Sequence, residues 1–413
     1  MKRLLCFFIV LFFVFGQFMA DAAADPVSLA TPGSPPSITG ETGVLIDVKT
    51  GKVLYDKKAH VRMEPASTTK IMTAILALEK GNLTDIVVTG KEPPRVDGSR
   101  IYLEEGEKLT LEQMLYALLL NSANDAAIAI AEHIGGDVPS FVKMMNEKAR
   151  EIGAKDTTFV NPNGLPADGH LTTAYDLALM ARYALLNLPE FRKIVSTKTF
   201  NIPWQGKEWD RRLVNLNKLL WNYEGADGVK TGYTHSAGKN LVASATKNGW
   251  HLIAVVLKSQ GQNVWQDAES LLDYGFNNFQ PETVIEKGRV ITSEKVKYGG
   301  SVELETSAGF STVIPRGTNP LTTKTVIKPG ITAPIKKGDV LGELEIFENG
   351  QKIGNVPLVA REDIPRKIYT NWWFWPGVIS LAFYAPFRIM VGVRRYKRYK
   401  NHTRYISYVK KYR

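Results

Sequence analysis

The stretch MEPASTTKIMTAI, residues 63–75, decides the fold, because it places Ser67 and Lys70 three positions apart where a helix is predicted to begin. Pro65 suits a first helical turn, and apolar residues then recur every three or four positions until Gly81. Residues three apart on a helix share a face, so the Lys70 amine can reach the Ser67 hydroxyl. Ser67 is therefore either a helix cap or a nucleophile with its own base beside it.

The Ser-x-x-Lys motif alone does not choose between these interpretations. It occurs at five serines of the chain, which are Ser67, Ser140, Ser236, Ser244 and Ser407. At least four of these must be chance, so the rest of the sequence has to decide.

The first 24 residues have the composition of a secretory signal peptide. Two cations precede an apolar run at residues 4–15, and small residues follow at 20–24. The sequence therefore predicts removal of residues 1–24 and export of the rest. The single cysteine, Cys6, lies in this segment, so the exported body has no disulfide and no cysteine metal ligand.

The positive charge of the chain is concentrated at its C-terminal end. The formal net charge is +11, and residues 388–413 hold ten Lys and Arg and no acid, so the remainder carries +1. An exported, nearly neutral body argues against a nucleic-acid partner. The six histidines show no metal-binding spacing, and we expect no metal and no cofactor.

Strands at both ends of residues 39–280, with helices between them, predict an α+β domain. Residues 43–56 read as a hairpin, and residues 228–258 read as strands joined at an Asn-Gly turn. The region 67–192 between them is helical in pattern. We expect one mixed sheet built from the two ends, flanked by a helical subdomain.

Four further segments surround this domain. Residues 25–38 are rich in Pro, Ser and Gly and read as a flexible lead-in, and residues 281–365 read as a small β domain. Residues 369–393 are apolar and begin with three tryptophans, as expected of a membrane anchor. Residues 394–413 form a basic tail.

The anchor has two possible modes. Its uncharged part, residues 372–387, would be about 24 Å long as a helix, short of the roughly 30 Å hydrocarbon core, which favours a helix lying on the membrane. Extension to Val393 gives about 33 Å but includes Arg388. The positive-inside rule favours a single span with residues 394–413 in the cytoplasm, and this is our prediction.

Two further motifs follow Ser-x-x-Lys in a recognisable order. Ser122-Ala123-Asn124 stands between two predicted helices, and Lys230-Thr231-Gly232 opens a predicted strand. Ser-x-x-Lys, Ser-x-Asn and Lys-Thr-Gly in this order are the signature of penicillin-binding proteins and serine β-lactamases.

The sequence around these motifs shows a closer resemblance to one family. PASTTKIMTA, LLLNSANDAA, NPNGLPADGHLTTAYDLALMARYAL and DGVKTGYTHSAGKNLVASA are similar to the low-molecular-mass penicillin-binding proteins that are D-alanyl-D-alanine carboxypeptidases. The resemblance covers about residues 38–280, with a weaker likeness to that family's β-rich C-terminal domain. It implies the penicillin-binding/β-lactamase-like transpeptidase fold.

The resemblance also implies partners and a location. The substrate would be a peptidoglycan pentapeptide ending in D-Ala-D-Ala, and β-lactam antibiotics would be covalent inhibitors. The protein would sit at the cell membrane, with its catalytic body on the extracytoplasmic side.

The residues of the first two motifs have candidate catalytic roles. A serine needs a base, and Lys70 can serve if burial and Lys230 lower its pKa. By resemblance, Ser122 relays a proton to the departing D-alanine. Asn124 would hold the substrate amide or Lys70, with a helix cap as the alternative.

The third motif has candidate binding roles. Lys230 and Thr231 suit the terminal carboxylate, and Gly232 permits close approach of the substrate backbone. The backbone N–H groups of Ser67 and Tyr233 would form the oxyanion hole, as the resemblance implies. Tyr233 stands where many relatives have histidine.

A second departure lies before the last helix of the domain. Relatives often carry a basic residue there that helps to hold the carboxylate, and this chain has Gln262, Asn263 and Val264. Carboxylate binding would then lean more heavily on Lys230 and Thr231.

Three alternatives remain open. A serine β-lactamase would need a Glu-x-x-Leu-Asn segment after Ser122, and the sequence has none. A DD-endopeptidase would use the same residues on a cross-linked substrate. A non-catalytic wall-binding scaffold would not explain why the reactive side chains occur in order.

Overall fold

The computed structural model describes residues 33–204 and 206–411, with side chains up to residue 404. The predicted signal peptide 1–24, Cys6 and most of the lead-in 25–38 lie outside the described residues. The chain divides into two units. The first contains the described residues up to Glu282 with Thr312–Asn319, and the second contains Thr283–Ser311 with the chain from Pro320 onward.

The first unit is built on a five-stranded sheet in the order β2-β1-β9-β8-β7, with every neighbouring pair antiparallel. Its strands are β1 (Thr42–Asp47), β2 (Val53–Lys57), β7 (Ala226–Thr234), β8 (Gly238–Lys247) and β9 (Trp250–Ser259). The N-terminal hairpin pairs with β9, so the prediction of one sheet made from both ends is confirmed. The predicted Asn-Gly turn joins β8 to β9, and both its residues have positive φ.

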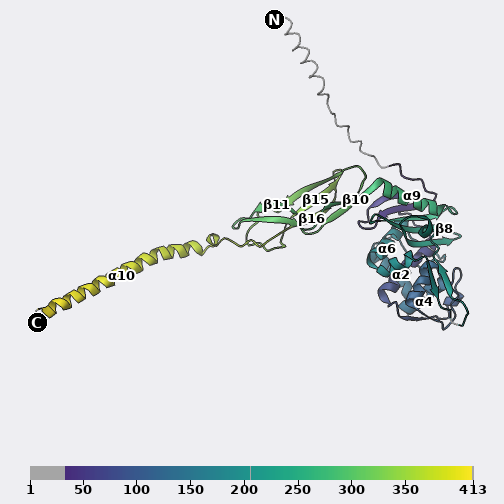
Figure 1. Ribbon diagram of the computed structural model, residues 1–413, viewed down its shortest axis with the longest axis horizontal. Helices are drawn as coiled ribbons and strands as arrows, with labels where there is room; N and C mark the ends of the chain where they lie inside the picture. Colours follow the sequence, from purple (N-terminus) through teal and green to yellow (C-terminus); the bar gives the residue numbers. More distant parts are fainter. Residues whose placement is uncertain (1–32, 205, 412–413) are drawn as a thin grey trace, which may run out of the picture. The chain divides into compact units, whose positions relative to one another are not determined.

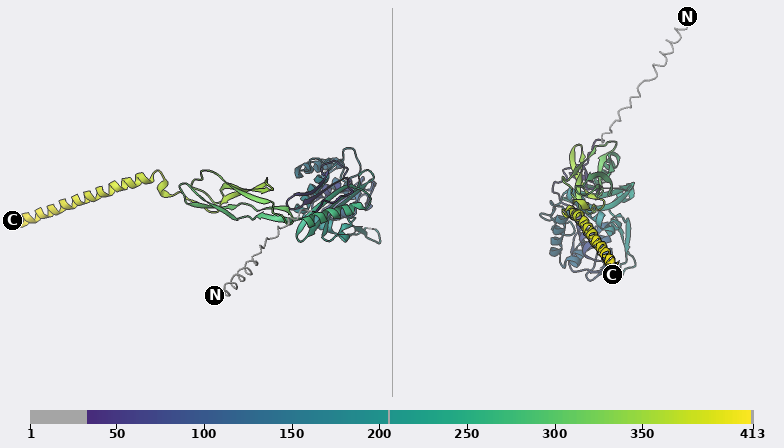
Figure 2. Two further views of the ribbon diagram at one scale, coloured as in Figure 1. Left: turned by 90° about the horizontal axis from the view of Figure 1, so that it is seen from above. Right: turned by 90° about the vertical axis from the view of Figure 1, so that its left-hand side faces the viewer.

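Both faces of this sheet are covered by helices, as Figures 1 and 2 show. On β1, Val44 and Ile46 belong to the core shared with the helical region, whereas Leu45 belongs to the core under α9 (Asn263–Asn278). This alternation follows from the two-residue period of a strand. Because both faces are apolar, all six residues of β1 are buried.

The helical region lies between β2 and β7. Its helices are α2 (Lys70–Lys80), α3 (Leu111–Leu120), α4 (Asn124–Gly135), α5 (Val138–Ile152), α6 (Ala174–Asn187), α7 (Pro189–Ser196) and the short α8 (Leu219–Asn222). Two 3₁₀ turns and two two-stranded antiparallel sheets complete it. The turns are η1 (Ala66–Thr69) and η2 (Pro93–Arg95), and the sheets pair β3 (Ile86–Val88) with β4 (Lys108–Thr110) and β5 (Thr199–Ile202) with β6 (Arg211–Val214).

The helix predicted to begin around Ser67 and Lys70 differs at its start. A 3₁₀ turn, η1, precedes the α-helix, which begins at Lys70. Ala66 has a left-handed φ of 49°, and the Thr68 hydroxyl donates to the Pro65 carbonyl at 2.7 Å. Ser67 is therefore held in a tight 3₁₀ turn and not in a turn of the α-helix.

The second unit is a small β domain followed by a helix. Its main sheet has the antiparallel order β11-β12-β16-β15-β14. The strands β10 and β13 form a separate two-stranded sheet, and each of them belongs partly to the first unit. The strands are β10 (Phe279–Ile285), β11 (Val290–Lys295), β12 (Ser301–Thr306), β13 (Phe310–Pro315), β14 (Leu321–Ile327), β15 (Val340–Glu348) and β16 (Gln351–Ala360). A separate core includes Val302, Ile346 and Leu358. The predicted α+β fold with a C-terminal β domain is confirmed.

A short turn η3 (Ile368–Thr370) leads to the long helix α10 (Phe374–Lys411). The segment Phe374–Arg404 is long and apolar enough to cross a membrane, and its most apolar part is not buried within the protein. The helix continues into the basic segment and contains Pro386. Such a helix is consistent with the predicted membrane anchor.

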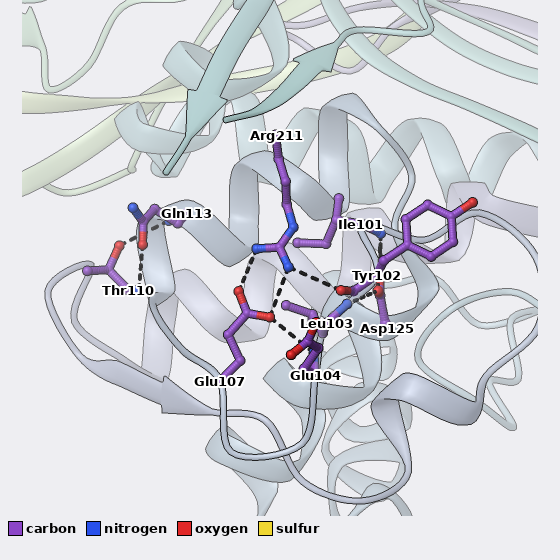
Figure 3. A network of polar contacts seen from close by, with 9 residues as sticks. All are labelled: Ile101, Tyr102, Leu103, Glu104, Glu107, Thr110, Gln113, Asp125 and Arg211. Atoms are coloured by element: carbon purple, nitrogen blue, oxygen red, sulfur yellow. Dashed lines mark hydrogen bonds and ion pairs between the residues drawn. The ribbon is translucent and has the colours of Figure 1, made fainter. Parts of the chain in front are cut away.

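A loop between η2 and β4 is fixed to the helical region by buried polar groups (Figure 3). The Asp125 carboxylate accepts from the backbone N–H groups of Ile101 and Leu103. Arg211 on β6 donates to both carboxylate oxygens of Glu107, at 2.5 and 2.9 Å. The Arg211 side chain is 4% exposed and that of Glu107 is 12% exposed, so this ion pair is largely shielded from water.

We predict that Arg211→Met lowers the free energy of unfolding by about 3–5 kcal/mol, because it leaves the buried Glu107 carboxylate unpaired. The double variant Glu107→Gln/Arg211→Met should recover much of this loss, since no buried charge remains. Chemical denaturation of the three proteins measures the difference. Equal stability of the single variant and the wild type would contradict the prediction.

Candidate active site

The turn that carries Ser67 is held from the strand side by β7 and β8. The Asn240 amide on β8 donates to the carbonyls of Glu64 and Pro65, at 2.9 and 3.0 Å. On β7, a Cβ added at Gly232 would meet the Pro65 oxygen at 3.1 Å and the Ser67 nitrogen at 3.2 Å. A side chain at this position would crowd the turn, so glycine allows the strand to lie against it.

A second glycine, Gly164, packs closely against the backbone of the same turn. Gly164 has a left-handed φ of +88°, and a Cβ there would lie 1.9 Å from the Ala66 oxygen. Any other residue would therefore displace Ser67. This glycine belongs to the Asn-Pro-Asn-Gly text quoted for the resemblance, but its contact with Ala66 was not predicted.

Lys70 is fully buried at the base of the site and donates to three oxygens. Its Nζ lies 3.1 Å from Ser67 Oγ, 2.7 Å from Asn124 Oδ1 and 2.5 Å from the Asn163 carbonyl oxygen. All three acceptors are neutral, so none of them compensates the charge of a protonated lysine. The Asn163 contact was not predicted, because a main-chain carbonyl leaves no signal in residue type.

Burial lowers the pKa of Lys70 well below its usual value, and the charge of Lys230 lowers it further, whereas Asp125 opposes the shift. Burial also lowers the pKa of Lys230 to about 7. The Lys230 side chain is 1% exposed, and its Nζ donates to the Thr231 carbonyl at 3.0 Å. The Lys70 pKa is thus lowered, as the sequence led us to expect, and the two expected causes, burial and Lys230, both contribute.

Asn124 is the first residue of α4, but its side chain does not cap the helix. Its Oδ1 accepts from Lys70, and its Nδ2 donates to the Asp97 carbonyl at 2.7 Å. Asn124 therefore connects Lys70 to the loop between η2 and β4. The helix-cap alternative for this residue fails.

Ser122 lies in the turn between α3 and α4, where it has a left-handed φ of 59°. This conformation is uncommon for a residue other than glycine and costs conformational energy. Ser122 is nearly buried, yet it lines the same cleft as Ser67. The strained turn thus presents a second hydroxyl to the cleft.

The cleft in front of Ser67 has a volume of about 310 Å³. Of the predicted site residues, Ser67, Ser122, Thr231, Gly232 and Tyr233 line it. Lys70, Asn124 and Lys230 are buried and do not line the cleft. The remaining lining residues are Ser99, Leu216, Lys218, Lys239, Asn240, Gln262, Val264 and Trp265.

One histidine supports the site from within the protein. His170 Nδ1 accepts from the Val160 N–H at 2.8 Å, so Nε2 carries the proton and donates to Thr69 Oγ1 at 2.9 Å. Burial lowers the pKa of His170 to about 4, so the ring is neutral at physiological pH. Its role is structural, since it braces η1. Among the described residues, no group of acids, cysteines or histidines is arranged to hold a metal ion.

Two protein-family models match this chain. The model of D-alanyl-D-alanine carboxypeptidase matches residues 29–261, and that of the penicillin-binding protein 5 C-terminal domain matches residues 279–366. The chain therefore belongs to the D-alanyl-D-alanine carboxypeptidase family of low-molecular-mass penicillin-binding proteins.

Individual relatives agree with this assignment. The chain is 38% identical to D-alanyl-D-alanine carboxypeptidase DacF of Bacillus subtilis, over 79% of this chain and 86% of that protein. It is 35% identical to D-alanyl-D-alanine carboxypeptidase DacC of Escherichia coli, over 80% of this chain and 85% of that protein. Penicillin-binding protein 5 of Haemophilus influenzae has a similar structure, with a TM-score of 0.72, 33% identity, and coverage of 81% of this chain and 99% of that chain.

The lowered pKa of Lys230 has a consequence for stability. Above about pH 7 the folded protein releases this proton, whereas the unfolded chain keeps it up to the usual lysine pKa of 10.5. Since the unfolded state binds more protons in this window, the free energy of unfolding rises with pH there.

We predict that Lys230→Met flattens this rise. Chemical denaturation at about pH 7 and about pH 9.5 should show a larger gain in stability for the wild type than for the variant. Lys70 contributes with the same sign in both proteins, and because Lys230 also lowers the Lys70 pKa, the difference between them reports Lys230 together with its effect on Lys70. The same gain in both would contradict a lowered Lys230 pKa.

Proposed function

We propose that this protein is a serine-type D-Ala-D-Ala carboxypeptidase, in which Ser67 removes the terminal D-alanine from peptidoglycan stem peptides through an acyl-enzyme. The observation that carries the proposal is the contact of Ser67 Oγ with the buried Lys70 Nζ at 3.1 Å. Burial and the charge of Lys230 lower the pKa of Lys70, and a lysine with a lowered pKa can accept the hydroxyl proton. Membership of the D-alanyl-D-alanine carboxypeptidase family supports the same chemistry.

The first half of the reaction forms the acyl-enzyme. Ser67 Oγ attacks the carbonyl carbon between the two terminal D-alanines while Lys70 takes its proton. The N–H groups of Ser67 and Tyr233 stabilise the oxyanion, as preorganised donors do in other acyl transfers. The C–N bond then breaks, and the leaving amine receives the proton held by Lys70 through Ser122, which lines the cleft with Ser67 and leaves Lys70 free to act as a base again.

The second half regenerates the enzyme. A water molecule attacks the ester carbonyl, and Lys70 takes a proton from it. The ester C–O bond then breaks, the shortened peptide leaves as a carboxylate, and Ser67 regains its proton. Asn124 keeps Lys70 in place throughout, through the 2.7 Å contact to its Nζ.

Lys230 and Thr231 bind the terminal carboxylate of the substrate. Thr231 lines the cleft, and Lys230 is the buried residue that precedes it on β7. A bound carboxylate favours the protonated form of a neighbouring lysine, which raises its pKa on binding. Substrate binding thus favours the positively charged form of Lys230, which burial alone disfavours.

Penicillin should acylate the same serine. The sequence lacks the Glu-x-x-Leu-Asn segment of a serine β-lactamase, so we expect the penicilloyl ester to persist for many minutes. Cross-linked peptidoglycan is the alternative substrate, which would make the enzyme a DD-endopeptidase. Loss of one alanine and cleavage of a cross-link are distinct products in a mass-spectrometric digest of peptidoglycan.

Replacement of the nucleophile tests the central assignment. Ser67→Ala should abolish both D-alanine release and covalent penicillin labelling, because no hydroxyl remains to form the acyl bond. Ser140→Ala is a matched control, since Ser140 begins another Ser-x-x-Lys motif on the exposed face of α5. D-alanine release that continued in Ser67→Ala would show that the nucleophile is another residue.

We further propose that residues 1–24 direct export and that the N-terminal part of α10 spans the membrane. The catalytic body would then lie on the extracytoplasmic side and residues 394–413 in the cytoplasm. The aromatic residues before α10 and the ten cations toward its C-terminal end support this orientation. A helix lying on the outer membrane surface is the alternative.

Protease added to intact spheroplasts distinguishes these two arrangements. A tag placed after Arg413 should remain protected while the body is digested, because the tail lies behind the membrane. Detergent lysis before proteolysis serves as the control and should expose the tag. A tag digested together with the body in intact spheroplasts would mean that α10 lies on the outer surface.

A further inference from the structure

The cleft in front of Ser67 is positively charged along its lining. Among the described residues that form it, the charged side chains are Lys218 and Lys239, and no carboxylate is present. Neither lysine belongs to the three motifs. The lining thus carries two positive charges and no negative one, so its field favours an anionic ligand.

Lys218 is presented to the cleft by a rigid turn. Residues 215–218 alternate between buried and exposed, so Leu216 and Lys218 both reach the cleft lining. The buried Asn217 between them donates to the Gly228 carbonyl of β7 at 2.8 Å and accepts from the Leu219 N–H at 3.1 Å. The position of Lys218 is therefore tied to the strand that carries Lys230.

The contact of Lys218 in the cleft is with a neutral group. Its Nζ lies 3.4 Å from Gln262 Oε1, which also accepts from Trp265 Nε1 at 3.2 Å. A glutamine orients the ammonium group without neutralising it. Gln262 stands in the segment where relatives often carry a basic residue, so here the cation comes from a different element.

Lys239 reaches the cleft from β8. It pairs with Tyr233 across the β7–β8 ladder, and its Nζ lies 4.9 Å from the centre of the Tyr233 ring. This cation–π contact also holds the ammonium group without cancelling its charge. Tyr233 is 57% exposed, so its side chain acts here as a platform at the cleft surface.

We propose that Lys218 and Lys239 form a carboxylate-binding subsite that favours stem peptides with a free side-chain carboxylate on the residue before D-Ala-D-Ala. This inference rests on the proposed function, in which Thr231 and Lys230 take the terminal carboxylate. With the scissile carbonyl at Ser67 and the terminus at Thr231, the remaining peptide must occupy the rest of the cleft. An upstream carboxylate then meets two cations whose contacts are with neutral groups.

Two pentapeptides ending in D-Ala-D-Ala test the subsite, one with a free side-chain carboxylate on the third residue and one with this group amidated. The wild type should cleave the first with the higher kcat/KM, chiefly through a lower KM. In Lys218→Met and in Lys239→Met the ratio of the two kcat/KM values should fall by about threefold to tenfold, the worth of a partly desolvated ion pair. Lys143→Met, at an exposed position on α5, removes the same charge and should keep the wild-type ratio.

The outcomes separate this inference from the proposed function. An unchanged ratio in both cleft variants would overturn the subsite, as would an equal loss for both peptides, which would assign the lysines to the terminal carboxylate. Calorimetry with Ser67→Ala measures the affinities of both peptides in the absence of turnover. Failure of the wild type to release D-alanine would refute the proposed function, while equal affinities of the two peptides for Ser67→Ala would refute the subsite.

Discussion

The structure of the site depends on one constraint, the burial of Lys70 beside Ser67 with a second lysine nearby. Burial and the field of Lys230 both disfavour the charged form of Lys70, and its three direct acceptors are neutral. An amine in such surroundings can act as a base toward a hydroxyl. The sheet, the helices and the glycines around it keep these two lysines in place and away from water.

The surrounding contacts explain why so much polar structure lies inside the first unit. Asn240 fixes the turn before Ser67, Asn124 connects Lys70 to the Asp97 carbonyl, and the Asn163 carbonyl receives the third Lys70 hydrogen bond. Gly164 and Gly232 allow backbone segments to approach the turn from two directions. Each of these groups is neutral, so the turn can be held rigidly without supplying a counter-charge that would keep Lys70 protonated.

Much of this arrangement could be predicted from the sequence. The three motifs indicated the residues that converge at the site, and strand patterns at both ends of residues 39–280 indicated one sheet. The rest depends on tertiary contacts. The Asn163 carbonyl could not be predicted because every residue type supplies one, and the 3₁₀ turn at Ser67 depends on the left-handed φ of Ala66. Lys218 and Lys239 lie outside the three motifs that indicated the site, and only the fold brings them to one cleft.

The charge state of Lys70 is the central claim, and NMR titration of isotope-labelled lysine side chains measures it most directly. We expect a Lys70 resonance that titrates well below the usual lysine pKa, and a titration shifted to higher pH in Lys230→Met, where the neighbouring charge is removed. Assignment by comparison with Lys70→Met identifies the signal. A Lys70 pKa at or above 10.5 in the wild type would contradict the account, because the amine could not then serve as the base for Ser67.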